Sequence, residues 1–152
     1  MGWPRLARVV AQVIAYAVSI LITAHSLCVE SGYRYADAEA VAQVAVNRSR
    51  ARGVPLWRVF DRSWNRGFPR ACGAPVTPEH LALALRAHVG LLDAPAWADD
   101  AVAFVTPRRE RGLTRHGDTV AQRWRRRGLE RAGVLVHVFY RRRHPVEGCG
   151  RR

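Results

Sequence analysis

One acidic residue, Glu30, stands where a carboxyl group could do chemistry. It lies in the stretch SLCVESG (26–32), at the end of a long apolar run. In the last turn of an apolar helix, a carboxyl loses water and faces the negative end of the helix dipole, so we expect its pKa to be raised. A carboxylic acid that is still protonated near neutral pH can protonate a glycosidic oxygen. Position alone therefore makes Glu30 a candidate general acid, with a solvent-facing glutamate as the alternative.

The apolar run that precedes Glu30 spans residues 9–24 (VVAQVIAYAVSILITA) and follows two arginines. Such a sequence is typical of a signal peptide or a signal anchor. Its polar members recur at intervals of three and four, which predicts one narrow polar stripe along a helix: Gln12, Tyr16, Ser19, Thr23, Ser26 and Glu30. Both a helix buried in a domain, with its stripe lining a cleft, and a membrane helix fit this pattern. Cleavage near Ala24 would remove most of the helix before Glu30, so we expect this helix to stay uncleaved.

Further elements follow along the chain. Asp37 is a suitable N-cap for a second helix over 38–52, which Gly53 would end. A third helix is predicted over 77–92, with Thr77 as its cap. Its inward residues are expected to be Leu81, Ala84, Leu85, His88 and Val89. The apolar residues expected to face inward from the second helix are Ala38, Val41, Ala42, Ala45 and Val46.

Two short runs of β-type residues, 101–105 (AVAFV) and 134–140 (VLVHVFY), could pair as strands. Between them, the arginine-dense segment 108–127 is expected to be solvated surface. Residues 1–20 are predicted to form an apolar helical extension or anchor, 21–143 one domain, and 144–152 a flexible basic tail.

The charge of the chain limits the sign of a partner. The net charge is +13, and all 25 basic residues are arginines. A field of this strength attracts polyanions such as nucleic acid, anionic lipid or an acidic wall polymer. An all-arginine set can also reflect a GC-rich genome. Charge therefore leaves the chemistry of the partner open.

The three cysteines, Cys28, Cys72 and Cys149, show no metal-ligand spacing, so neither a zinc site nor any other metal or cofactor is predicted. Two arrangements fit. Cys72 and Cys149 could form a disulfide in an oxidising compartment, or all three could be free thiols, with Cys28 as a small core residue.

Residues 29–60 (VESGYRYADAEAVAQVAVNRSRARGVPLWRVF) resemble the SleB-type cell-wall hydrolases, the family of spore-cortex lytic enzymes. The counterparts of the family motifs are Glu30-Ser31-Gly32, then AVAQVAVNR (40–48) and VPLWRVF (54–60). Further on, AVAFVTP (101–107) and HVFYR (137–141) resemble its later strands. The second glutamate of the family's turn is missing here, and the loop SGYRYAD is one residue shorter than its counterpart.

This resemblance implies an α+β, lysozyme-like fold, mainly helical with a small β-hairpin or sheet and preceded by the long apolar helix. It also implies cleavage of peptidoglycan glycan strands by lytic-transglycosylase-like chemistry. Glu30 would first act as acid and then as base while the muramyl 6-hydroxyl closes an anhydro ring. No second catalytic carboxylate is needed, unlike the usual pair in glycosidases.

Five other residues are candidates for the site. Trp64 and Phe68 could stack on sugar rings or plug the core. His137 could line the cleft or face the other side of its strand. Asn47 and Arg48 are expected to close the second helix and brace the Glu30 turn, with substrate contact as the alternative.

The expected partner is therefore peptidoglycan, with the arginine-rich face holding an anionic membrane surface, and the chain is expected to be a monomer in the cell envelope or secreted. Two other functions fit parts of the sequence. A small basic nucleic-acid-binding protein would explain the charge, but no nucleic-acid-binding motif is present, so no specific nucleic acid is expected. A membrane-anchored envelope or lysis accessory protein without activity would explain the apolar run.

Overall fold

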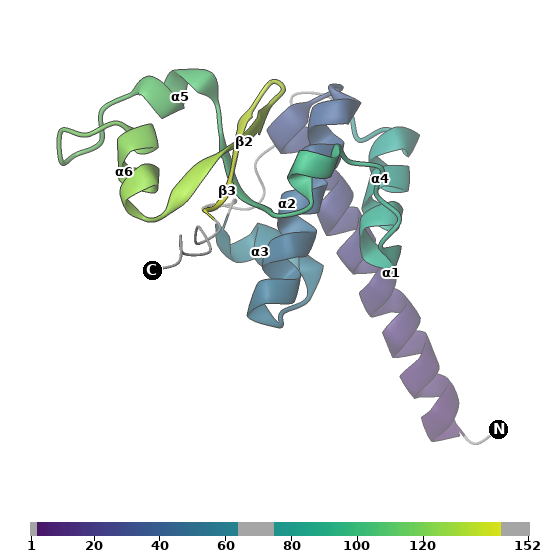
Figure 1. Cartoon of the computed structure of the whole chain (residues 1–152). Helices are drawn as coiled ribbons and strands as arrows, with labels where there is room; N and C mark the ends of the chain where they lie inside the picture. The colour runs from purple at the N-terminus through teal and green to yellow at the C-terminus, as the bar shows by residue number, and fades with distance from the viewer. Residues whose placement is uncertain (1–2, 64–74, 144–152) are drawn as a thin grey trace, which may run out of the picture.

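The computed structural model describes residues 3–63 and 75–143 of the chain, and the side chains of residues 61–63 are outside the description. Within these residues the protein combines helices with one small antiparallel sheet (Figure 1). The elements are α1 (Trp3–Ser31), α2 (Tyr35–Arg52), α3 (Leu56–Ser63), α4 (Pro78–Val89), η1 (Ala96–Ala98), β1 (Ala101–Val105), α5 (Pro107–Arg111), α6 (Val120–Arg126), β2 (Leu129–Val134) and β3 (Val138–Arg142). The expected combination of helices, a small sheet and an apolar N-terminal helix is confirmed.

Helix α1 has two different halves (Figure 1). Residues 3–18 are exposed on all sides, whereas seven residues from Ser19 onward are buried against the rest of the domain. The helix is continuous across residue 20, so the predicted extension and the domain share one element. Its second half belongs to the core, where Leu27 is fully buried.

Helix α2 forms the centre of the fold. The predicted apolar stripe is confirmed, and Ala40 and Val44 are buried as well, so this helix is covered on nearly every side. It begins at Tyr35, with Arg34 as an N-cap that makes no side-chain cap bond. The predicted N-cap role of Asp37 is therefore wrong, because Asp37 lies inside the first turn and its carboxylate is buried in other contacts. Gly53 ends the helix in the left-handed conformation, as predicted.

The inward face of α4 differs from the prediction. Thr77 caps the helix as expected, but the buried residues are His80, Leu83, Ala84 and Ala87. Leu81, Leu85 and Val89 are exposed instead. The helix is turned because the His80 side chain, which belongs to a capping box with Thr77, also bonds to the α1–α2 turn.

The sheet has the order β1-β3-β2, and both pairings are antiparallel. The predicted pairing of 101–105 with the later run is confirmed through β1 and β3. The run 134–140 is not one strand, however, because β2 ends at Val134 and β3 begins at Val138. His137 therefore lies in the turn of a hairpin. Trp97 covers this hairpin at Gly133, where an added Cβ would lie 2.4 Å from the indole ring.

Two further expectations need correction. Segment 108–127 is not solvated throughout, because the Glu110 side chain is buried. Cys28 is disulfide-bonded, so neither expected arrangement of the cysteines holds, whether a Cys72–Cys149 pair or three free thiols. Cys72, Cys149 and the tail 144–152 lie outside the described residues.

Candidate active site

Glu30 occupies the last turn of α1 and is half-buried. The helix ends one residue later, and Gly32 follows with a φ of 55°, a left-handed conformation that glycine adopts without strain. The Gly32 amide donates to the Cys28 carbonyl at 2.9 Å and closes the helix end. The sequence prediction that Glu30 stands at a helix end, with glycine turning the chain away, is confirmed.

A buried carboxylate fixes the chain directly after Glu30. The Ser31 hydroxyl donates to Asp37 Oδ2 at 2.8 Å, and His137 Nδ1 lies 2.6 Å from the same oxygen. The His137 backbone amide donates to Asp37 Oδ1 at 3.0 Å. Asp37 therefore joins the end of α1 to the hairpin turn, 100 residues further along the chain.

Asp37 is held in its ionised form. Burial raises its pKa, but the hydrogen bonds and charge of His137 and the hydrogen bond from Ser31 outweigh burial, so the pKa lies below its usual value. A carboxylate so committed to three donors is a positioning group rather than a reacting one. His137, the predicted substrate contact, is buried at 5 % exposure and reaches the Glu30 turn through Asp37.

His80 braces the same turn from α4. Its Nδ1 accepts from the Thr77 amide at 3.1 Å, so Nε2 carries the proton and donates to the Gly32 carbonyl at 2.7 Å. The rings of Tyr33 and Tyr35 pack around this imidazole, with centroids 6.0 and 5.2 Å away. Sequence reasoning missed His80, whose signal is a histidine three residues after the cap Thr77.

Asn47 and Arg48 brace a different contact from the one predicted. Asn47 Nδ2 donates to the carbonyls of Ala98 and Ala101, at 3.0 and 2.8 Å, and Arg48 Nε donates to the Val102 carbonyl at 2.6 Å. Burial and then the charge of Arg52 lower the pKa of Arg48 to about 10. The two residues also do not close α2, which continues to Arg52. They tie α2 to β1, and only through the sheet to the hairpin that holds His137.

Trp64 and Phe68, the other two predicted sugar contacts, lie outside the described residues. The structure therefore brings together Glu30, Ser31, Asp37, His137 and His80, of which the sequence had selected Glu30 and His137.

A second buried carboxylate, Glu110, lies on the far side of the sheet. Arg131 donates to both of its oxygens, at 2.8 and 2.6 Å, and the Tyr140 hydroxyl donates to one of them. Burial raises the pKa of Glu110, but these bonds outweigh it and hold the pKa below its usual value. For Tyr140, burial and then the bond to Glu110 raise the pKa. We assign this cluster to the stability of the sheet.

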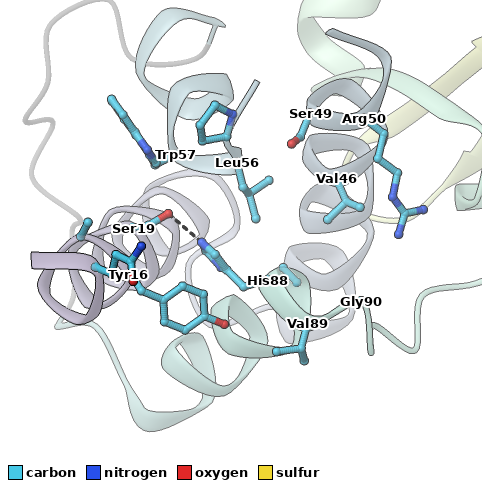
Figure 2. A pocket seen from close by; sticks show the side chains of 14 residues that line it. Tyr16, Ser19, Val46, Ser49, Arg50, Leu56, Trp57, His88, Val89 and Gly90 are labelled. Carbon is cyan, nitrogen blue, oxygen red and sulfur yellow. Dashed lines mark hydrogen bonds between the residues drawn. The ribbon is translucent and has the colours of Figure 1, made fainter. Parts of the chain in front are cut away.

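A pocket of about 620 Å³ opens at the opposite end of the helices, between α1, α2, α3 and α4 (Figure 2). Its floor includes His88, whose Nδ1 donates to the Ala84 carbonyl at 2.7 Å, so Nε2 accepts from the Ser19 hydroxyl at 2.7 Å. Ser19 precedes Glu30 by roughly 17 Å along the helix axis. The pocket and the Glu30 turn are therefore separate features.

In residues 3–63 and 75–143, no three His, Cys, Asp or Glu side chains gather as a metal site would require. Within the same residues, α1 is the one helix long and apolar enough to cross a membrane by length and composition. Comparison of the chain with protein-family models, curated proteins and solved structures finds no match.

Proposed function

We propose that the protein is a cell-wall hydrolase that cleaves peptidoglycan between muramyl and glucosaminyl sugars. The observation that carries this proposal is the placement of Glu30: a half-buried carboxyl at the end of an apolar helix, in a turn fixed by Asp37 and His80. The resemblance of residues 29–60, 101–107 and 137–141 to the SleB-type hydrolases supports it independently, because those motifs follow in family order.

In the proposed reaction Glu30 first protonates the glycosidic oxygen. The same carboxylate then takes the proton of the muramyl 6-hydroxyl as that oxygen attacks the anomeric carbon and closes the anhydro ring. The turn supplies what a single-carboxyl mechanism needs, a fixed orientation, because His80 and Asp37 hold the residues on its C-terminal side. Asp37 itself is bound by three donors, which leaves the acid–base steps to Glu30.

The helix–sheet arrangement agrees with a lysozyme-like fold, which we include in the proposal. Trp64 and Phe68 stay predicted sugar-stacking residues. We assign His137 a positioning role, because it is buried and bonded to Asp37.

We place the protein in the cell envelope, held by an uncleaved N-terminal helix. Two observations support this location. The second half of α1 is part of the core, so cleavage near Ala24 would remove buried residues such as Thr23 and detach Glu30's helix. The disulfide at Cys28 is typical of proteins in an oxidising compartment outside the cytoplasm.

The decisive experiment is release of soluble anhydro-muropeptides from purified sacculi. The substitution Glu30→Gln keeps size and polarity but removes the proton donor, so we expect release to fall at least ~100-fold. The matched control is Glu130→Gln, another half-buried glutamate, which pairs with Arg141 at the opposite end of the β2–β3 hairpin from His137. Loss of release in both variants, or in neither, contradicts the assigned role of Glu30.

A second candidate is a membrane-anchored envelope or lysis accessory protein without activity, which the long exposed half of α1 favours. If the folded wild-type protein releases no muropeptide between about pH 4 and pH 8, where a carboxyl of normal or raised pKa changes protonation, this candidate replaces the enzyme.

A further inference from the structure

Helix α1 leaves a broad row of apolar side chains exposed. Val13, Ile14 and Leu21 are 63, 57 and 58 % exposed. In the half of the helix that contacts the domain, Ser19, Thr23 and Ser26 are buried together with Ala24, Leu27 and Cys28. A helix on the surface of a protein in water places its apolar stripe inward. A broad exposed apolar face, with small polar residues at the helix contact, is typical of helices whose surroundings are lipid.

The polar stripe of α1 continues into its exposed half. Arg5, Arg8, Gln12 and Tyr16 lead to Ser19 at intervals of three and four, so all five lie along one side of the helix. Ser19 faces the domain, which places both arginines on the side away from the apolar face. A basic polar stripe opposite a broad apolar face is the pattern of helices that lie in the plane of a membrane interface.

Helix α1 as a whole is long enough to cross a bilayer, but the part of it outside the domain is not. Between Arg8 and the first buried residue, Ser19, ten apolar-rich residues cover roughly 15 Å, about half of a ~30 Å hydrocarbon core. A longer span would have to include the half of α1 that contacts the domain (Figure 1). It would carry the end of α2, with its exposed Arg50 and Arg52, into hydrocarbon.

We propose that the protein lies on a lipid bilayer through one apolar surface, with α1 parallel to the membrane plane and not across it. The lipid-facing surface consists of Val10, Val13, Ile14 and Leu21 of α1. The net charge of +13 favours a bilayer with anionic headgroups. This contact does not depend on whether Glu30 cleaves glycans.

A polypeptide of these 152 residues allows a direct test of topology, because it contains no lysine and its α-amino group is its single primary amine. The protein is added to preformed, sealed vesicles of phosphatidylcholine and phosphatidylglycerol at about 3:1, followed by a membrane-impermeant amine reagent. An in-plane α1 leaves the N-terminus outside, so labelling of the vesicle-bound protein should reach the level seen after the vesicles are dissolved in detergent. Protection that only detergent relieves shows a crossing and overturns the proposal.

A pair of substitutions tests the apolar face of α1. Ile14→Asp places a charge on the proposed lipid-facing surface, whereas Leu113→Asp places one at an exposed leucine on the α5–α6 connection. In co-flotation with these vesicles, we expect the partition coefficient to fall about tenfold for Ile14→Asp. Leu113→Asp should leave it unchanged, and circular dichroism should show that both variants are folded. Equal partition of the two variants contradicts the proposed surface.

A second copy of the chain is the competing occupant of this surface. In that case the protein is a dimer in buffer by light scattering, Ile14→Asp converts it to a monomer, and vesicle binding is unaffected. That set of results overturns the proposal in favour of self-association.

Discussion

Two buried carboxylates, Asp37 and Glu110, hold the two sides of the protein together in different ways. Asp37 accepts from Ser31 and from the side chain and backbone of His137, whose side chain is 6 % exposed. Glu110 accepts from Tyr140 and from Arg131, whose side chain is 55 % exposed. The partners of Asp37 therefore have no route to water, whereas the main partner of Glu110 does.

This difference in the exposure of the donors indicates that the network around Glu110 can be altered with less loss of stability than the network around Asp37. Removing an acceptor costs most where the donors it leaves behind remain buried. The network around Asp37 also adjoins Glu30, and the network around Glu110 connects α5 to the outer sheet. Asp37 thus links fold stability to the candidate active site, and Glu110 contributes to stability alone.

The largest effect is expected from Asp37→Ala. This change leaves Ser31 Oγ, His137 Nδ1 and the His137 amide without their acceptor, and we expect the free energy of unfolding to drop by ~3–5 kcal/mol. Urea denaturation followed by circular dichroism measures the drop. A loss below ~1 kcal/mol would show that water reaches these donors and that the two carboxylates are alike.

Glu110→Ala should cost less, about 2 kcal/mol, because the Arg131 guanidinium can turn toward water and only the Tyr140 hydroxyl stays buried. The same urea titration applies, with the Asp37→Ala protein as reference. Muropeptide release per folded molecule should stay at the wild-type level for Glu110→Ala. Selective loss of release would assign this cluster a part in the reaction.

The smallest effect is expected from acid, which should lower the free energy of unfolding by weakening both networks. The folded-state pKa of each carboxyl lies below its unfolded value, 3.8 for Asp37 and 4.5 for Glu110. Their stabilising contributions are therefore complete above those values and are lost as the pH falls through the lower folded-state pKa. We expect wild-type stability to fall by ~1 kcal/mol or more between pH 5 and pH 3, and Asp37→Asn to show a shallower fall. An identical slope in the two proteins would remove Asp37 as a source of the pH dependence.

The helix at the centre of the fold was predictable from its residues. Ala38, Val41, Ala42 and Ala45 repeat with helical spacing, and Gly53 is a typical C-terminal signal, so sequence alone located α2 and its inward face. The position of Glu30 at a helix end was predictable for a similar reason, because an acidic residue between an apolar run and a glycine is a local signal.

The inward face of α4 could not be predicted with the rule that apolar residues point inward. That rule selected Ala84, which is buried, but also Leu81, Leu85 and Val89, which are exposed. The rotation of the helix follows from the bond between His80 and the α1–α2 turn, which has no local signal in the sequence. The bond between Asp37 and His137 had no local signal either, because the partners are 100 residues apart. The hairpin turn within 134–140 contains no glycine, proline or asparagine, so the segment resembled one continuous strand.

Helix α1 also has a mechanical consequence. From Arg5 to Ser31 it contains no glycine or proline, so it has no hinge between its exposed half and the turn of Glu30. It is a stiff lever of roughly 40 Å, and a tilt of about 10° at one end moves the other end by about 7 Å unless the domain turns with it. In the proposed arrangement, with α1 on a bilayer and Glu30 cleaving glycans, bilayer thickness and curvature would set the height at which Glu30 meets its substrate.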